Sequence, residues 1–234
     1  MRYYDRNGKL NGEVDTQDWL LASLYNHFAG RLLVKVMIHP AVSKAAGRFL
    51  SSRLSCFLIK PFVRAKKIDL SCCEKVRFKS YNDFFTRRLR PEAHPMDADP
   101  LHLIAPCDSK LTVYPITSRG RFSVKHTLYT LDTLLQNKKL AAKYRDGYAC
   151  IFRLTVDDYH HYCYVDDGAK SSNHKISGVL HTVNPIANDI TPIYKENARE
   201  YSILRSKHFG NVLMMEVGAL LVGKIVNCHG AASV

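Results

Sequence analysis

The periodicity of the apolar residues changes near residue 100, and this change constrains the fold more than any other feature of the sequence. Before it, apolar side chains recur at the three- and four-residue spacing typical of helices. After it, short runs rich in Val, Ile, Tyr, Phe and Thr alternate with turn residues. Helices followed by strands predict an α+β fold, in which N-terminal basic amphipathic helices precede a mostly antiparallel β core.

The same periodicity assigns the individual elements. Asn7-Gly8 and Asn11-Gly12 indicate a turn or small hairpin within residues 3–14. The helical stretches cover about 17–39, 42–58, 61–68, 81–90 and 130–145. Strands are predicted at 111–116, 121–125, 149–156, 161–165, 174–183, 201–205, 211–218 and 221–226.

The chain is long enough for one sizeable core, with 234 residues of which 46% are apolar. We therefore expect a single domain over 1–234, with a helical part at 1–90 and a β-rich part at 91–234.

Positive charge is concentrated in the helical part. Residues 1–90 contain 18 lysines and arginines against 7 acidic residues, whereas residues 91–234 contain 16 against 14. This asymmetry favours an anionic partner, either nucleic acid or an anionic membrane, with general solubility as the alternative explanation. Because the basic residues flank apolar helix faces within 17–67, the pattern favours membrane contact over nucleic-acid binding. No apolar run approaches the roughly 20 residues that span a bilayer, so we expect peripheral contact.

The seven cysteines indicate reduced thiols, because they are odd in number and scattered, with no secretory signal before them. His160 and Cys163 have a ligand-like spacing, and Cys228-His229 lies elsewhere, but no complete set of metal ligands is present. We therefore predict no metal site.

The segment Asp157-Asp158-Tyr159-His160-His161-Tyr162-Cys163 contains the side chains best suited to proton transfer. If it is a strand, neighbouring residues point to opposite faces, so only one of His160 and His161 can face a site. The alternative is that these histidines are hydrogen-bonded surface residues in a polar turn.

Asp108 and the two glycines Gly218 and Gly223 each allow a structural or a functional interpretation. Asp108, in Pro106-Cys107-Asp108-Ser109, is either a turn former or an acidic site residue. Gly218 and Gly223 flank an apolar stretch, where glycine permits a bulge or a close approach of the backbone.

Seven stretches occur in one order: 81–87 with Leu89-Arg90-Pro91; Pro106-Cys107-Asp108; 122–125 with Tyr129-Thr130-Leu131 and Leu134-Leu135; Leu154 with Asp158-Tyr159-His160; 180–185; 197–200; and 217–223. Together they resemble the phosphatidylserine decarboxylase family, and the resemblance covers the chain from about residue 15 to 230.

The resemblance implies a carbon–carbon lyase that converts phosphatidylserine to phosphatidylethanolamine. The cofactor would be a covalent pyruvoyl group, formed when a Ser in a C-terminal Gly-Ser-Thr cleaves the proenzyme into a large and a small subunit. By matching position, Asp108 would orient the base for self-cleavage and His160 would donate the proton during decarboxylation. The substrate-binding residues would be His181, Asn184, Gly218, Leu221 and Gly223.

The resemblance also implies partners and a location. The enzyme would act on phosphatidylserine in an anionic membrane, would contain a small pyruvoyl-bearing subunit, and would form a homo-oligomer. It would lie peripherally on the cytoplasmic face of the cell membrane, and no nucleic acid would be bound.

Three positions depart from the family pattern. The sequence ends at Gly230-Ala231-Ala232-Ser233-Val234 without Gly-Ser-Thr, so we interpret it as a C-terminally incomplete copy. Cys163 stands where many members have the histidine base. Because an unperturbed thiol has a pKa of about 8.5, the base stays open between Cys163, His126 and His161. Ser109 replaces a glycine and would cost about 1 kcal/mol if its φ were positive.

Two alternatives to the enzyme stay open, the first supported by these departures and the second by the basic charge. One is a catalytically inactive lipid-binding relative, and the other is a basic nucleic-acid-binding domain.

Overall fold

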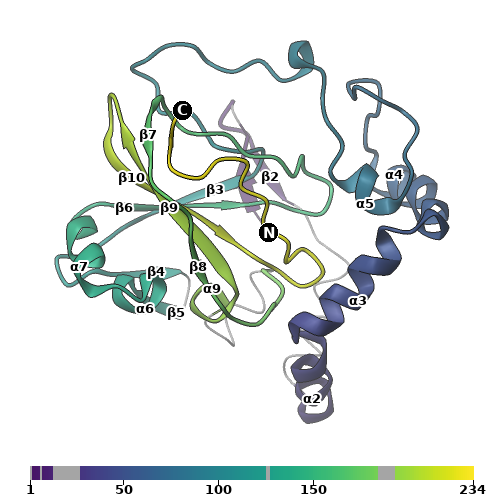
Figure 1. Ribbon diagram of the computed structural model, residues 1–234, viewed down its shortest axis with the longest axis horizontal. Helices are drawn as coiled ribbons and strands as arrows, with labels where there is room; N and C mark the ends of the chain where they lie inside the picture. The colour runs from purple at the N-terminus through teal and green to yellow at the C-terminus, as the bar shows by residue number, and fades with distance from the viewer. Residues whose placement is uncertain (1, 6, 13–26, 125–126, 184–192) are drawn as a thin grey trace.

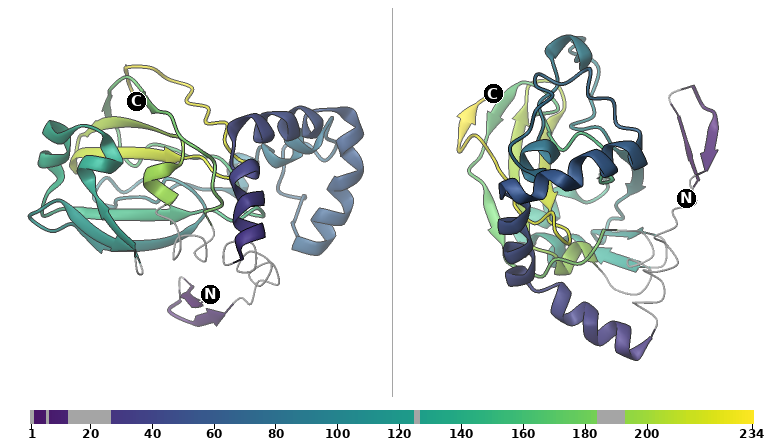
Figure 2. Two further views of the ribbon diagram at one scale, coloured as in Figure 1. Left: turned by 90° about the horizontal axis from the view of Figure 1, so that it is seen from below. Right: turned by 90° about the vertical axis from the view of Figure 1, so that its right-hand side faces the viewer.

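The computed structural model describes residues 2–5, 7–12, 27–124, 127–183 and 193–234. The helices that precede residue 91 lie to one side of a β-rich body (Figures 1 and 2). Every pair of strands in the described ranges is antiparallel. The predicted α+β class, with N-terminal helices before an antiparallel core, is therefore confirmed.

A small hairpin opens the described chain, as predicted. Strand β1 (Arg2–Tyr4) pairs with β2 (Leu10–Gly12). The Asp5 carboxylate accepts hydrogen bonds from the backbone N–H groups of Asn7 and Lys9, each at 2.9 Å. An acidic side chain that bonds to the backbone of its own turn is a common way to close such a connection.

The helical part begins with α2 (Phe28–Met37) and α3 (Pro40–Leu50), and residues 17–26 of the predicted first helix lie outside the described residues. Pro40 suits the first turn of α3, because its missing N–H would have no partner there. The predicted helix 42–58 ends at Leu50, because the hydroxyl groups of Ser51 and Ser52 donate to the carbonyls of the last turn. The chain continues as the 3₁₀ helix η1 (Arg53–Leu58), then α4 (Ile59–Lys66), α5 (Tyr81–Phe85) and the 3₁₀ helix η2 (Pro91–Ala93).

The predicted helix 81–90 is wrong after Phe85. The Arg90 backbone N–H donates to the Cys72 carbonyl at 2.9 Å, and Cys73 forms an isolated bridge with Leu89. Tertiary pairing with residues 72–73 replaces the helical hydrogen bonds in this segment.

The β body contains two strand pairs and one larger sheet. The pairs are β3 (Lys110–Pro115) with β6 (Tyr148–Arg153), and β4 (Arg121–Val124) with β5 (Thr127–Thr130). The larger sheet has the order β10 (Gly210–Val217), β9 (Arg199–Ser206), β7 (Gly168–Lys170) and β11 (Ala232–Ser233), and β8 (His174–Ile176) also pairs with β9. The short helix α9 (Ile193–Glu196) precedes β9. Strands β5, β7 and β11 and helix α9 were not predicted.

Three strand predictions and one further helix prediction, all in the β body, need correction. Residues 161–165 and 221–226 form no strand, and the strand predicted at 174–183 stops at Ile176. The helix predicted at 130–145 is divided into α6 (Leu131–Leu135), α7 (Lys138–Ala141) and the 3₁₀ helix η3 (Ala142–Tyr144). The break follows from Gln136, whose φ of 50° is left-handed, and from Asn137, whose side chain caps α7.

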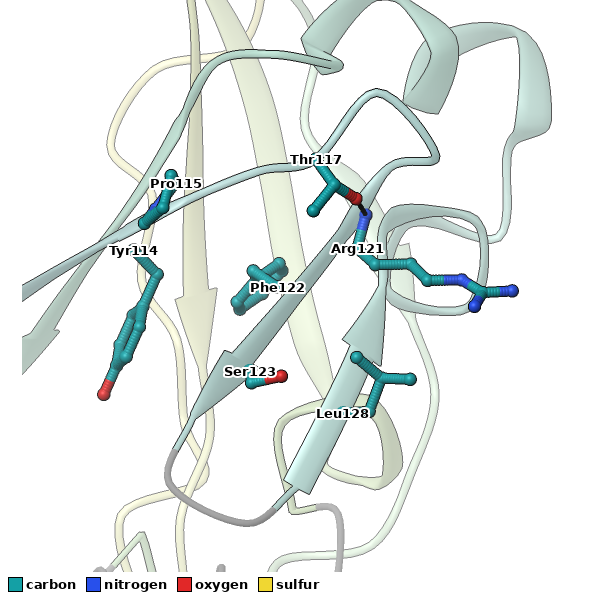
Figure 3. Close-up of a pocket in the computed structure, with 7 residues that line it drawn as sticks. All are labelled: Tyr114, Pro115, Thr117, Arg121, Phe122, Ser123 and Leu128. Carbon is teal, nitrogen blue, oxygen red and sulfur yellow. Dashed lines mark hydrogen bonds between the residues drawn. The ribbon is translucent and has the colours of Figure 1, made fainter.

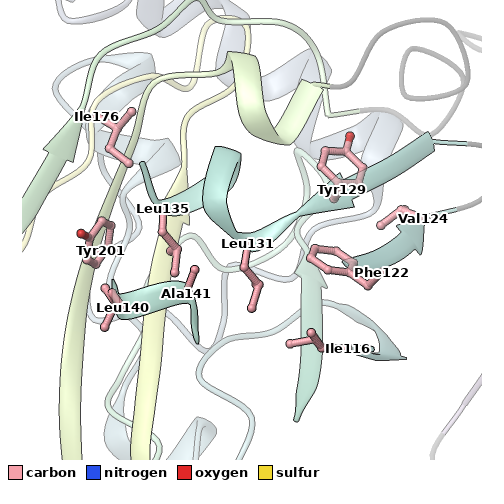
Figure 4. Close-up of a cluster of buried hydrophobic side chains, with 10 residues drawn as sticks. All are labelled: Ile116, Phe122, Val124, Tyr129, Leu131, Leu135, Leu140, Ala141, Ile176 and Tyr201. Atoms are coloured by element: carbon pink, nitrogen blue, oxygen red, sulfur yellow. The ribbon is translucent and has the colours of Figure 1, made fainter. Parts of the chain in front are cut away.

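The main core lies between the β4–β5 pair, helices α6 and α7, and strands β8 and β9 (Figure 4). The Tyr129 ring is fully buried, and its centroid lies 5.7 Å from that of Phe122 in a stacked arrangement. The cluster consists of Ile116, Phe122, Val124, Tyr129, Leu131, Leu135, Leu140, Ala141, Ile176 and Tyr201.

A separate aromatic cluster stabilises the helical part. Phe84 of α5 is fully buried, and the rings of Phe62, Phe78 and Tyr81 meet it edge-on at centroid distances of 6.0, 5.5 and 5.7 Å. The Arg87 guanidinium lies 5.3 Å from the Phe84 ring centroid. Edge-on rings and an overlying cation are favourable aromatic geometries, so Phe84 anchors this part.

Replacing Phe84 with alanine should therefore lower the free energy of unfolding by about 3–5 kcal/mol. Phe57→Ala is the matched control, because Phe57 is 67% exposed on η1 and should change the free energy by less than about 0.5 kcal/mol. Denaturant unfolding of both variants measures the difference. Equal midpoints for the two variants would show that the cluster does not stabilise the helical part.

Candidate functional site

Asp108 and Cys163 lie on neighbouring segments. The Cys163 backbone N–H donates to the Pro106 carbonyl at 2.8 Å, and the Cys163 thiol lies 3.5 Å from the same oxygen. The loop that carries His160 and Cys163 therefore packs beside the turn that carries Asp108. The segments that carry the three residues proposed for catalysis are thus neighbours, and the side chains of Asp108, His160 and Cys163 each contact other residues.

His160 is held in one tautomer. Its Nε2 lies 2.9 Å from the Thr155 carbonyl oxygen, which only accepts, so Nε2 carries the hydrogen and Nδ1 carries the lone pair. The Asp158 carboxylate fixes this turn by accepting from the Thr155 backbone at 2.5 Å and from its hydroxyl at 2.9 Å. The ring lies 4.2 Å from that of Phe85. Burial lowers the pKa of His160, although the Thr155 carbonyl and Asp158 oppose this, so the imidazole is neutral near pH 7.

The surroundings of Cys163 do not favour its thiol as the base for self-cleavage. Burial raises the pKa of its thiol, which therefore stays protonated near neutral pH. His161 stacks on Tyr159 at a centroid distance of 4.6 Å, and its Nε2 lies 3.3 Å from the Thr86 carbonyl oxygen. His126, the other residue considered for this role, lies outside the described residues.

His94, which no sequence pattern indicated, contacts the group formed by Asp108, His160, Cys163 and their two segments, called the first cluster below. Its Nε2 lies 3.0 Å from an Asp108 carboxylate oxygen, and its ring centroid lies 5.5 Å from that of Tyr159. His94 follows η2 in a polar segment without hydrophobic periodicity, so no sequence pattern connected it to Asp108.

Arg87 is a second residue near this site that the sequence did not single out, since it appeared only within the motif 81–87. It is buried and donates through one terminal nitrogen to the Asp157 carbonyl at 3.0 Å. Its other terminal nitrogen has no hydrogen-bond partner among the described residues. Arg87 therefore ties the aromatic cluster of the helical part to the loop that carries His160.

The predicted substrate-binding residues form a second cluster around Asn197. The buried Asn197 side chain accepts from the His181 N–H at 2.9 Å and donates to the His181 carbonyl at 2.9 Å and the Gly218 carbonyl at 2.7 Å. His181 is also buried, with Nε2 3.5 Å from the Glu196 carboxylate, and burial lowers its pKa more than Glu196 raises it. Asn184 lies outside the described residues.

Gly218 and Gly223 show the close approach that the sequence indicated. A Cβ at Gly223 would lie 2.5 Å from the Leu180 side chain, and a Cβ at Gly218 would lie 3.2 Å from the Ala198 carbonyl oxygen. Neither position has room for a side chain without movement of its neighbours.

Leu221 occupies a strained turn between these glycines. Its φ is 64°, a left-handed conformation that costs about 1–2 kcal/mol for a residue with a Cβ. Its backbone N–H donates to the Ser43 hydroxyl of α3 at 3.3 Å, and its side chain is 52% exposed. The turn thus contacts the helical part. Ser109 has no positive φ, so the strain considered for that position does not arise.

Tyr162 links the two clusters. Its hydroxyl lies 3.2 Å from the Val226 carbonyl oxygen and 3.1 Å from the Asn227 side-chain oxygen, and it shares its one hydrogen between these two acceptors. The Asn227 amide in turn donates to the carboxylates of Glu200 and Glu216, at 2.9 and 3.4 Å. These two acids are directly opposite on β9 and β10, and burial raises the pKa of Glu216. The segment after Gly223 is therefore bound to the loop of His160.

A hollow of about 260 Å³ elsewhere on the molecule contains none of the predicted site residues (Figure 3). Its lining is Tyr114, Pro115, Thr117, Arg121, Phe122, Ser123 and Leu128. The Arg121 side chain points away from the others (Figure 3). Within the described part of the chain, no group of three or more His, Cys, Asp or Glu side chains is arranged to hold a metal ion.

Residues 81–232 match the sequence model of phosphatidylserine decarboxylase. A Clostridium acetobutylicum protein named phosphatidylserine decarboxylase proenzyme 2 is 43% identical over 226 residues, which are 96% of this chain and 75% of the relative. This chain belongs to the phosphatidylserine decarboxylase family. Phosphatidylserine decarboxylase proenzymes of Clostridium botulinum and Clostridium novyi are each 39% identical, and cover 80% and 91% of this chain. The chain spans 64% and 74% of those two relatives.

Both clusters fall within the matched range of this family. The range includes Asp108, His160 and Cys163 of the first cluster and His181 and the glycines of the second. Helices α2, α3 and α4 precede it. The resemblance drawn from the motifs is therefore confirmed at the level of the family, while the individual residue roles stay predictions.

Two desolvated histidines, the half-buried His160 and the buried His181, should make this decarboxylase-family protein sensitive to acid. The folded pKa values of His160 and His181 lie below the unfolded value of about 6.5, so the unfolded chain binds more protons as the pH falls. Stability should therefore decrease as the pH drops below about 6.5. Unfolding at pH 7.5 and 5.5 should show a smaller decrease for His160→Gln than for the wild type. His102→Gln, at an exposed position, should keep the full decrease, and an unchanged decrease in His160→Gln would refute the assignment.

Proposed function

We propose that this protein decarboxylates phosphatidylserine to phosphatidylethanolamine through a pyruvoyl group, which forms by self-cleavage at a serine further along the full-length protein. The observation that carries this proposal is the setting of His160: a neutral, desolvated imidazole held by Thr155 and Phe85, in the loop that matches the family motif. The relatives' names as proenzymes support the self-cleavage step.

The residues present fit a pyruvoyl group. Such a group supplies a ketone that accepts the electron pair left when the bond to the substrate carboxylate breaks. The carbon that loses carbon dioxide then needs a proton in a site protected from water. A half-buried histidine beside an aromatic ring provides both conditions.

Because Nε2 is engaged with the Thr155 carbonyl, Nδ1 of His160 takes up a proton from solvent between turnovers and then delivers it to the carbon. Burial lowers the pKa of His160, which makes its protonated form a stronger acid and favours transfer to carbon. Asp158 holds the turn and keeps the ring in this orientation. Asp108 and the glycine turn lie on the segments that Tyr162 and Cys163 connect to this loop.

His160→Ala in the full-length protein should reduce decarboxylation about 100-fold or more, while leaving self-cleavage in place. Release of carbon dioxide from phosphatidylserine vesicles measures the first effect. Mass spectrometry measures the second, as two fragments of which the smaller begins with a pyruvoyl group. His161→Ala is the neighbouring control.

A wild-type protein that stays intact and still binds the vesicles would contradict the enzyme and favour an inactive lipid-binding relative. Binding to nucleic acid but not to vesicles would favour the nucleic-acid-binding alternative.

We further propose that the helical part holds the enzyme peripherally on the cytoplasmic face of the membrane that contains its substrate. Phe28, Leu32 and Val36 follow one another at four-residue spacing along α2, and all three are exposed, as is Leu33. Exposed apolar side chains continue on α3 and η1 with Phe49, Leu54 and Phe57. None of the described helices has the length and hydropathy needed to cross a bilayer.

Cations accompany these apolar side chains. Lys35 lies on α2, Lys44 and Arg48 lie on α3, and Arg53 lies on η1, and all four are exposed. Apolar insertion combined with attraction to anionic lipids is the usual basis of interfacial binding. The proposed assembly also includes the small pyruvoyl-bearing subunit and further copies of the chain.

The combined substitution Leu32→Ser, Leu33→Ser and Val36→Ser should weaken binding to phosphatidylserine vesicles by about tenfold or more, because each apolar side chain contributes roughly 1.5–3 kcal/mol on burial. Leu111→Ser with Val113→Ser on β3 is the matched control, since these residues are 52% and 48% exposed but lie outside the helical part. Vesicle co-sedimentation measures both. Equal loss in the two variants would contradict docking through α2.

A further inference from the structure

His94 and Asp108 form a histidine–carboxylate pair that the sequence did not indicate. His94 Nε2 lies 3.0 Å from Asp108 Oδ1. An ionised carboxylate only accepts, so Nε2 carries the hydrogen and Nδ1 of His94 carries the lone pair. A base oriented by a carboxylate in this way is the arrangement that activates a hydroxyl nucleophile.

The pair lies within the first cluster and is accessible. The His94 ring contacts Tyr159, the residue before His160, at 5.5 Å between centroids. Asp108 follows the segment whose Pro106 carbonyl holds Cys163. The side chains of His94 and Asp108 are 39% and 44% exposed, so another segment of the protein can reach Nδ1.

Within the first cluster, the other residues that could serve as a base lack this arrangement. The Cys163 thiol is directed to the Pro106 carbonyl, and burial keeps it protonated. His161 and His160 each place Nε2 near a backbone carbonyl, of Thr86 and Thr155 respectively, rather than near a carboxylate.

We infer that His94, positioned by Asp108, is the base that accepts the hydroxyl proton of the self-cleaving serine; this inference rests on the proposed function. As the serine Oγ bonds to the carbonyl carbon of the preceding residue, its proton passes to Nδ1 of His94. The C–N bond of that peptide then breaks, and the proton moves from His94 to the leaving nitrogen. The product is an ester, and His94 is returned to its neutral form. The later elimination that separates the fragments is not assigned to His94.

The test follows the rate at which the two fragments appear in the full-length protein, by gel electrophoresis and mass spectrometry. His94→Ala should slow cleavage about 100-fold or more, and added imidazole should restore it. Asp108→Asn should also slow cleavage, because it removes the group that fixes the tautomer. His102→Ala is the matched control: His102 pairs with the Asp97 carboxylate at 2.8 Å in the same polar segment and should cleave at the wild-type rate.

Cys163→Ala tests whether Cys163, rather than His94, is the base. It should slow cleavage much less than His94→Ala does. Two results would overturn the inference and leave the proposed function standing. One is cleavage of His94→Ala at the wild-type rate. The other is a His94→Ala variant that has a wild-type circular dichroism spectrum but whose cleavage imidazole does not restore. A wild-type protein that does not cleave at all would instead overturn the proposed function, and this inference with it.

Discussion

Two buried side chains at the start of β9 satisfy backbone groups on which the rest of the structure depends. Asn197 bonds to both backbone groups of His181 and to the Gly218 carbonyl. Arg199 donates to the carbonyls of Thr133 and Leu134 at the end of α6, and to those of Lys195 and Asn197. A buried polar group without a partner costs about 1–3 kcal/mol. These two residues therefore fix three distant segments around one central strand.

The helical part and the site are joined at a few defined points. Arg87 connects the aromatic cluster around Phe84 to the carbonyl of Asp157. Ser43 of α3 binds the backbone of Leu221 in the strained turn. The face proposed to contact lipid is thus connected to both clusters by direct contacts.

Sequence patterns predicted those helices and strands whose conformation is determined by the preferences of their own residues. β9 and β10 appear as predicted because β-type residues fill long paired strands. Residues 161–165 have similar composition, yet Cys163 bonds to Pro106 and Tyr162 to Val226, contacts with segments far along the chain. The order of motifs made Asp108 and His160 candidates, whereas the contact of His94 with Asp108 depends on the path of an irregular segment. Gln136 divides a helix through a left-handed conformation that apolar spacing cannot indicate.

The amide of Asn227 has a consequence for the ageing of the protein. It is the donor that lies between the carboxylates of Glu200 and Glu216, while its oxygen accepts from Tyr162. Spontaneous deamidation would turn this residue into a third carboxylate, remove both donated hydrogen bonds and place three negative charges in contact. The segment 226–227 would then be repelled from the sheet and pull on the loop of His160.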